Sequence, residues 1–219
     1  MASTPDFAAP SSADHAGLMD SIYRWQRPIY DLTRKYYLFG RDRLIDELGA
    51  QPGMALLEVG CGTGRNLARI AQAWPGVRCH GLDISAEMLK SARKRMGAGG
   101  RLALGDATAF DAAALFGREG FDRVVLSYTL SMIPDWQGAL AQAAGTLAPG
   151  GSLHVVDFGS AQGLPRPLRA LLHGWLSRFH VTPRRDLAEV AQRLALAHGL
   201  HCEVQHGAMG YYQMVRLTR

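Results

Sequence analysis

Three glycines in the run Leu56 to Arg65 have the spacing of a loop that holds a nucleotide cofactor. The run reads Leu-Leu-Glu-Val-Gly-Cys-Gly-Thr-Gly-Arg, an apolar stretch that leads into Gly60, Gly62 and Gly64 and then into a helical pattern. Glycine lets the backbone turn tightly off a strand and approach a ligand closely, and the following helix offers free N–H groups. The spacing is one residue shorter than the dinucleotide fingerprint, so we expect no pyrophosphate here.

Three acidic residues accompany the apolar runs that precede these turns. Glu58 stands just before the glycines, where a carboxylate repels a pyrophosphate but accepts an ammonium group, so it favours a zwitterionic cofactor. Asp83 ends the run Val77 to Leu82, 23 positions beyond the first glycine, and an acid there can accept both ribose hydroxyls. Asp106 follows the run Arg101 to Gly105, from which its carboxylate or the neighbouring backbone can meet an adenine amino group.

These motifs resemble those of class I S-adenosylmethionine-dependent methyltransferases. The resemblance rests on Glu58-Val-Gly-Cys-Gly-Thr-Gly, Asp83-Ile-Ser and Gly105-Asp106-Ala107, and it covers the chain from about Leu44 to the C-terminus. It implies an α/β fold with a single doubly wound, seven-stranded, mostly parallel sheet of Rossmann-like type, and S-adenosylmethionine across the carboxyl ends of the first four strands. The cofactor-binding residues that it implies are Glu58, Gly60, Cys61, Gly62, Gly64, Asp83, Ile84, Asp106, Ala107 and Ser127.

Length and composition agree with one large domain. The chain has 219 residues, 47% of them hydrophobic, with alternating strand and helix signals. The remaining predicted strands are 121–127, 152–157, 202–206 and 211–217, the predicted helices are 66–74, 136–147 and 187–198, and a turn is predicted at Pro149-Gly150-Gly151 before the fifth strand. We expect residues 1–17 to be a mobile tail, 18–43 a helical lid and 44–219 the methyltransferase domain.

Cysteine usage and hydropathy indicate a cytoplasmic protein. The three cysteines are odd in number, and Cys61 and Cys79 fall within or beside predicted strands, which is typical of small buried residues in a reduced compartment. No run of 18 apolar residues exists, and residues 1–17 lack the basic start and apolar region of a signal peptide.

The segment Met19 to Arg43 carries four of the seven tyrosines of the chain. On helical geometry, aromatic and cationic side chains would alternate along one stripe, made of Tyr23, Arg27, Tyr30, Arg34, Tyr37 and Arg41. Pro28 breaks or kinks a helix, so two short helices fit the pattern as well as one long helix. The stripe is compatible with ordinary packing and solvated arginines, or with a lid over an acceptor, because tyrosine faces attract alkylammonium groups and arginines bind carboxylate or phosphate.

The sequence of this segment resembles that of bacterial lipid-headgroup N-methyltransferases. The nearer resemblance is to the enzymes that trimethylate diacylglyceryl-homoserine into a betaine lipid, and phosphatidylethanolamine N-methyltransferases are similar too. The resemblance covers some 25 residues, and the substrate-binding residues that it implies are Tyr23, Arg27, Tyr30, Arg34 and Tyr37.

A basic segment lies between the fifth strand and the last predicted helix. Phe158 to Arg185 contains five arginines and no acid, against a net charge of +5 for the whole chain. Within it, apolar residues from Leu168 to Phe179 fall at helical steps, with the helix begun by Pro165 or Pro167. An ordinary core-facing helix has the same spacing. The alternative is a helix whose apolar face dips into an anionic bilayer interface, and a nucleic-acid surface ranks below both because no stacking platform accompanies the arginines.

The candidate catalytic residues follow from the demands of methyl transfer. The acceptor must be aligned behind the methyl carbon, which supplies about 7–11 kcal/mol, and an amine acceptor must lose its proton. Tyr128 follows the fourth strand, where the resemblance places acceptor-facing residues, and Tyr30 belongs to the lid stripe. His180 and Asp157 are candidates for proton removal, although a structural role fits each of them as well.

We therefore predict an N-methyltransferase that uses S-adenosylmethionine, visits the inner face of the membrane and acts on the amine of a lipid headgroup, with no metal and no nucleic-acid partner. The alternatives are phosphatidylethanolamine and a soluble acceptor such as a quinone precursor. A nicotinamide oxidoreductase is disfavoured by the glycine spacing and by the lack of a Tyr-x-x-x-Lys pair. A non-catalytic cofactor-binding module stays open, as does the oligomeric state.

Overall fold

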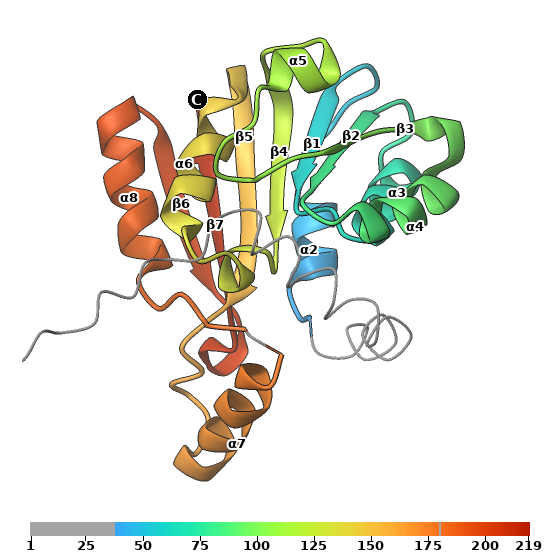
Figure 1. The fold of residues 1–219 in the computed structure, drawn as a ribbon. Helices are drawn as coiled ribbons and strands as arrows, with labels where there is room; N and C mark the ends of the chain where they lie inside the picture. The colour runs from blue at the N-terminus through green and yellow to red at the C-terminus, as the bar shows by residue number, and fades with distance from the viewer. Residues whose placement is uncertain (1–37, 180) are drawn as a thin grey trace, which may run out of the picture.

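A seven-stranded sheet forms the centre of the molecule (Figure 1). The computed structural model describes residues 38–179 and 181–219. Its strands are β1 (Ala55–Val59), β2 (Arg78–Asp83), β3 (Gly100–Leu104), β4 (Phe121–Ser127), β5 (Leu147–Phe158), β6 (His201–His206) and β7 (Tyr212–Thr218). Their order is β3-β2-β1-β4-β5-β7-β6, and neighbours are parallel except that β7 runs antiparallel to both β5 and β6. The predicted fold class is confirmed.

Helices cover both faces of the sheet because its central strands are apolar on both sides. In β1, Leu56 belongs to one buried cluster and Leu57 to the other, as the two-residue period of a strand requires. The Leu56 face is covered by α2 (Arg41–Asp46), α3 (Arg65–Ala73) and α4 (Ala86–Met96), and the Leu57 face by α5 (Ala112–Phe116), α6 (Trp136–Gly145) and α8 (Leu187–His198). The remaining helix, α7 (Arg166–Ser177), follows β5 and projects beyond the sheet at the end where the parallel strands terminate (Figure 1).

Short polar residues fix where several helices begin. Ser85, Asp111 and Asp135 each accept, at the side chain, the N–H of the residue three positions further on. Gly117 and Gly199 end α5 and α8 in the left-handed conformation that glycine adopts without strain. These caps lie in the turns between strands and helices, so they help to set the loops at which each strand ends.

The predicted elements agree with the structure except around the start of the fifth strand. β4 and α8 have the predicted bounds, and the other predicted strands and helices differ by one or two residues at their ends. The predicted turn at Pro149-Gly150-Gly151 is wrong, because these residues lie inside β5, which already begins at Leu147 paired with Phe121. The pairing shifts register between Phe121 and Arg123, so the strand accommodates the glycines as an irregularity.

Two further expectations concern the cysteines and the N-terminal segment. Cys61 and Cys79 are free and buried, and Cys202 is free and half-buried. Among the helices in residues 38–179 and 181–219, none is long and apolar enough to cross a bilayer. The predicted tail and most of the predicted lid, residues 1–37, lie outside the described residues, and the described part of the lid leads into α2.

Candidate active site

The glycine loop leaves β1 and enters α3 through three left-handed residues. Gly60, Gly62 and Gly64 have φ values of 72°, 53° and 73°, a region that favours glycine. A Cβ on Gly60 would lie 2.3 Å from Cγ2 of Thr129, so the packing under the loop also requires glycine there. A Cβ on Gly62 would meet nothing within 4 Å, so this part of the loop faces open space where a ligand can approach the backbone.

Asp83 fixes the loop against the end of β2. The carboxylate is 8% exposed; its Oδ2 accepts the N–H of Gly62 at 2.7 Å and its Oδ1 accepts the N–H of Ser85 at 2.9 Å. The carbonyl oxygen of Leu82 accepts the N–H groups of Gly60 and Cys61 at 2.8 and 2.9 Å. These bonds join the first and second motifs and orient the acid, while its contact with the ribose stays a prediction.

The third motif lies beside the second. The N–H of Gly105 donates to the carbonyl oxygen of Asp83 at 3.0 Å, which brings the turn after β3 against the turn after β2. Asp106 Oδ1 accepts the N–H and the hydroxyl of Thr108 at 2.8 and 2.7 Å. Ile84 and Ala107 are half-buried at the same two turns. The three predicted motifs thus gather at one edge of the sheet, as parallel strands require.

Glu58 is held by a residue that the sequence analysis did not single out. The carboxylate is 1% exposed, and its Oε1 accepts a hydrogen bond from Asn66 Nδ2 at 2.7 Å. Asn66 lies in the first turn of α3, whose N-terminus faces the glycine loop. A polar amide in the first turn of a helix after a glycine loop was the only signal, and it is weak because such residues are common at helix starts.

A pocket opens beside the loop between α2 and β1. It is lined by Leu38, Arg41, Glu58, Gly60, Cys61, Gly62, Thr63, Arg65, Asn66 and Ser127. Arg41, which the sequence analysis placed on the lid stripe, is 7% exposed and lines this pocket, while its contact with an acceptor stays a prediction. The pocket therefore holds a carboxylate and guanidinium groups together. Arg41 Nε and Nη2 also donate to Asp42 Oδ1 at 3.3 and 3.2 Å, which leaves further N–H groups of the guanidinium for a ligand. These charges fit a zwitterion, whose ammonium group suits Glu58 and whose carboxylate suits Arg41.

Ser127 and Tyr128 end β4 at the rim of this pocket. Ser127 Oγ is buried and makes no hydrogen bond within the described part of the chain, so it is available to a ligand. Tyr128 is 1% exposed, and its hydroxyl donates to the carbonyl oxygen of Phe39. Its φ of 55° is unusual for a residue other than glycine. In this structure Tyr128 therefore anchors the chain that enters α2, and contact with an acceptor stays a prediction.

Burial explains the electrostatics of Tyr128 and Asp157. Burial, followed by the nearby charge of Asp157, raises the pKa of Tyr128 well above its usual value, so the hydroxyl stays protonated and acts as a donor. Asp157 is 0% exposed, and burial raises its pKa too. Its two oxygens accept the N–H groups of Ser131 and Phe158 at 3.0 and 2.7 Å. Asp157 thus ties the turn after β4 to β5, which is a structural role, and proton removal by this residue stays a prediction.

The remaining predicted site residues belong to the N-terminal segment or to position 180. Tyr23, Arg27, Tyr30, Arg34, Tyr37 and His180 lie outside the described residues. Their assignment to the acceptor or to proton removal stays a prediction.

Known proteins share both the motifs and the sheet of this chain. A methyltransferase domain family matches residues 57–153. The ubiquinone/menaquinone biosynthesis C-methyltransferase UbiE of Paracoccus denitrificans is 32% identical over 187 residues, which cover 81% of this chain and 72% of that protein. The chain belongs to the class I S-adenosylmethionine-dependent methyltransferases. This methyltransferase also shares its fold with phosphoethanolamine N-methyltransferase 2 of Haemonchus contortus, crystallised with S-adenosylmethionine, at a TM-score of 0.74 and 15% identity over 99% of this chain and 61% of that chain.

S-adenosylmethionine is the cofactor of the methyltransferase, and the pocket fits its charges. When bound, it supplies an electrophilic methyl group on a sulfonium. The buried Glu58 carboxylate and the Arg41 guanidinium match the ammonium and carboxylate of the methionyl end. Gly62, with open space above it, lets the cofactor approach the loop. The protein therefore contributes binding and orientation, which is what an in-line methyl transfer asks of it.

Proposed function

We propose that this methyltransferase transfers methyl groups to the amine of a membrane-lipid headgroup at the inner face of the membrane. Diacylglyceryl-homoserine, methylated to a betaine lipid, is the acceptor we favour, and phosphatidylethanolamine is the alternative lipid amine. The observation that carries the proposal is α7, a basic helix with exposed leucines on the side of the molecule where the cofactor pocket opens.

The side chains of α7 divide between the protein and its surroundings. Leu176 is buried, and Leu172 and Trp175 are half-buried in the cluster beneath the helix. Leu168 and Leu171, on the same helix, are 53% and 71% exposed. The sequence analysis expected one apolar face, and the structure uses only the C-terminal half of it for packing. The exposed half is available to a bilayer interface.

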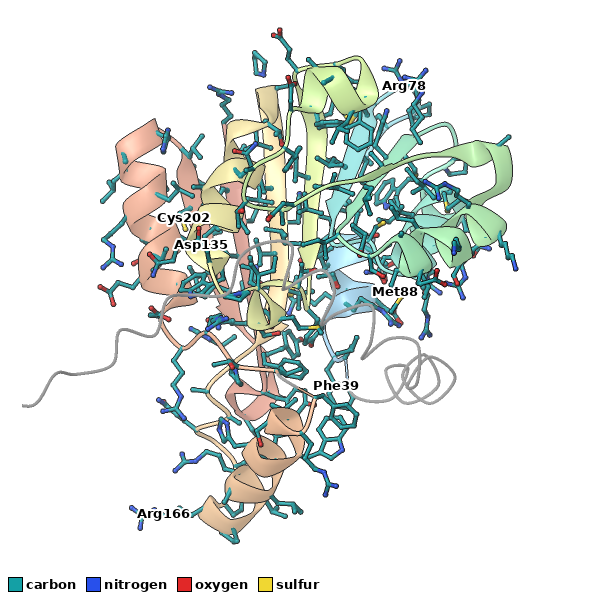
Figure 2. The ribbon with its side chains drawn as sticks, in the orientation of Figure 1. Phe39, Arg78, Met88, Asp135, Arg166 and Cys202 are labelled. Carbon is teal, nitrogen blue, oxygen red and sulfur yellow. The ribbon has the colours of Figure 1, made fainter. Side chains whose placement is uncertain are left out.

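Charge and position support docking on an anionic membrane. Phe158 to Arg185 contains five arginines and no acid. Arg166 and Arg169 lie in α7, whereas Arg184 donates to the carbonyl oxygens of Leu130 and Ile133. Each cation near an anionic surface contributes about 1 kcal/mol. Figure 2 shows Arg166 at the outer tip of α7 and Phe39 at the same end of the sheet. Phe39 is 55% exposed and directly follows Leu38, which lines the cofactor pocket. A membrane bound here would face the active site.

The exposed ring of Phe39, just before α2, suits an amine that becomes quaternary. The ring of Phe39 packs edge-on to Tyr211 with centroids 5.3 Å apart, and Phe158 lies 6.0 Å from Tyr211. Aromatic faces attract alkylammonium groups without needing a carboxylate. In the reaction the neutral nitrogen forms a bond to the methyl carbon as the carbon–sulfur bond breaks, and the nitrogen loses a proton to water or a base until the last methylation leaves none to lose.

Carbon methylation of a quinone precursor is the second candidate. It is favoured by the 32% identity with the Paracoccus denitrificans C-methyltransferase. A carbon acceptor gains no permanent charge, so it does not require the aromatic and basic surroundings described above. The first candidate yields an N-methylated lipid and the second a ring-methylated quinone precursor, so identifying the product decides between them.

The acceptor is tested by supplying purified protein and labelled S-adenosylmethionine with three substrates. These are diacylglyceryl-homoserine in mixed micelles, phosphatidylethanolamine in the same micelles, and a soluble quinone precursor. Mass spectrometry should find mono-, di- and trimethylated homoserine lipid. A methylated quinone ring with unmodified lipids would overturn the proposal in favour of the second candidate.

Membrane docking is tested separately by flotation with anionic vesicles. The test compares substitutions of two exposed leucines, Leu171 on α7 and Leu196 on α8. Burying a leucine side chain contributes about 1.5–3 kcal/mol, so Leu171→Gln should weaken vesicle binding about tenfold. Leu196 on α8 is 85% exposed and serves as the matched control. Leu196→Gln should leave vesicle binding unchanged. Equal loss in both variants would remove α7 as the docking element.

A further inference from the structure

The end of the sheet opposite the cofactor pocket carries a basic hollow. It lies at the amino ends of β2 and β3 and is lined by Arg78, His80, Arg101, Phe116 and Arg118, with the glycines around residue 100 at its edge. Figure 2 shows Arg78 at the end of the sheet away from Phe39. None of the residues of the cofactor pocket lines this hollow. It is therefore a second candidate site, with no role in the proposed methyl transfer.

Three guanidinium groups around the basic hollow come from three separate segments and are each held by a backbone carbonyl. Arg78 Nε donates to Gly53 at 3.0 Å, Arg101 Nη1 to Phe116 at 3.0 Å, and Arg118 Nε to Gly120 at 2.7 Å. A guanidinium carries five N–H donors, so each arginine keeps further N–H groups after this bond. The side chains are thus oriented in advance, with donors to spare.

No carboxylate lines the basic hollow among the residues that the structure describes. The nearest acid that acts on Arg118 is Asp122, whose Oδ2 accepts the N–H of Ala55 at 2.7 Å. Arg118 itself is affected by burial and by Arg78, both of which lower its pKa. Three cations therefore share one hollow without an acid in its lining, and an anion bound there would relieve their repulsion.

His80 adds a buried ring to the floor of the basic hollow. The side chain is 4% exposed, and its Nδ1 lies 3.1 and 3.0 Å from the carbonyl oxygens of Leu56 and Arg78. Nδ1 therefore carries a proton, and Nε2 makes no hydrogen bond to a residue in the described ranges. Burial, and then Arg118 and Arg101, lower the pKa of His80. A bound anion would offset the field of the arginines and raise that pKa.

We propose that the basic hollow binds a small phosphate-bearing anion. Guanidinium groups present paired donors that match the oxygens of phosphate, and such charge-assisted bonds are about twice as strong as neutral ones. Three guanidinium groups around one hollow supply more N–H donors than a single carboxylate can accept. The phosphate belongs to a soluble ester or to a phospholipid headgroup, and this site does not depend on which acceptor the enzyme methylates.

The test uses the full-length protein and inorganic phosphate, glycerol 3-phosphate and vesicles of phosphatidic acid in phosphatidylcholine. Binding is followed by calorimetry and by the pH titration of the His80 ring in NMR spectra. Phosphate should raise the pKa of His80. Arg101→Gln should weaken phosphate binding about tenfold, the loss expected for one charge-assisted bond, and Arg101→Lys should recover only part of it. Tighter binding of glycerol 3-phosphate than of phosphate supports a soluble ester, and tighter binding of phosphatidic acid vesicles than of both supports a headgroup.

Arg193 on α8 provides a control with the same change in net charge. Its side chain is 62% exposed and pairs with Glu189, so Arg193→Gln should change phosphate binding by less than about twofold. Thermal unfolding and S-adenosylmethionine binding of each variant confirm that it is folded. An unchanged His80 titration in the presence of phosphate, or an equal loss in Arg101→Gln and Arg193→Gln, would overturn the proposal.

Discussion

Neutralising Asp83 tests whether this acid holds the cofactor or only the glycine loop. In Asp83→Asn the side chain keeps its shape and one oxygen that can accept the Gly62 N–H, which lies 2.7 Å from Asp83 Oδ2 in the wild type. It loses its charge, and its NH2 group, in the place of Oδ1, can no longer accept the N–H of Ser85. A hydrogen bond to a charged group contributes about 1.5–3 kcal/mol and a neutral one about 0.5–1.5 kcal/mol. Each bond from the carboxylate to a ribose hydroxyl should thus weaken by about 1–1.5 kcal/mol.

Two ribose hydroxyls make the expected loss at least tenfold in affinity, because about 1.4 kcal/mol corresponds to a factor of ten. The assay is calorimetric titration of the protein with S-adenosylmethionine. Asp122→Asn is the matched control, since Asp122 Oδ2 also accepts a backbone N–H at 2.7 Å, from Ala55 at the opposite end of β1. Both variants should lose stability, and only Asp83→Asn should lose affinity.

Two results would refute this reasoning. A folded Asp83→Asn protein with the wild-type dissociation constant would mean that Asp83 serves the loop alone. An equal loss of affinity in Asp122→Asn would mean that the effect reflects general destabilisation of β1 and its neighbours.

Three further predictions concern the sites around the pocket and the sheet. Gly60→Ala places a Cβ 2.3 Å from the Thr129 methyl at a φ of 72°, so it should lower the unfolding free energy by more than about 1 kcal/mol and reduce cofactor affinity, measured by urea unfolding and calorimetry. Tyr128→Phe removes the hydroxyl that donates to the Phe39 carbonyl, which should cost about 1 kcal/mol and speed proteolysis before α2, whereas an unchanged cleavage rate would contradict the anchoring role. Burial lowers the pKa of His154 from 6.5 to about 3, so as the pH falls the imidazole is protonated in the unfolded chain before it is protonated in the folded protein. The unfolding free energy should therefore drop by about 3 kcal/mol between pH 7 and pH 4. Denaturant titrations of His154→Gln should show a weaker dependence on pH.

The cofactor half of the site was predictable because its signals are local. The glycines fall where the backbone must adopt positive φ, and the acids fall at the ends of strands whose apolar runs are easy to see. Once parallel strands are assumed, their carboxyl ends meet at one edge, which is why Glu58, Asp83 and Asp106 gather as expected.

The other features of the site could not be predicted from the sequence, because they depend on contacts between segments that are far apart in the chain. Arg41 lines the cofactor pocket because α2 packs beside β1, and none of its neighbours in the sequence indicates this position. Tyr128 bonds to Phe39 across 89 positions of sequence. Pro149 and the glycines after it have the composition of a turn, yet pairing with β4 draws them into β5, because tertiary context overrides local preference.

The cofactor loop and α7 lie in separate parts of the sequence, so each can be changed without changing the other. The turns that surround the glycine loop all lie before residue 130, while α7 lies between β5 and α8 and carries the exposed Leu168 and Leu171. A library that randomises the exposed positions of residues 166–171 would therefore keep the bonds that orient Asp83 and would test whether α7 determines which surface the enzyme binds.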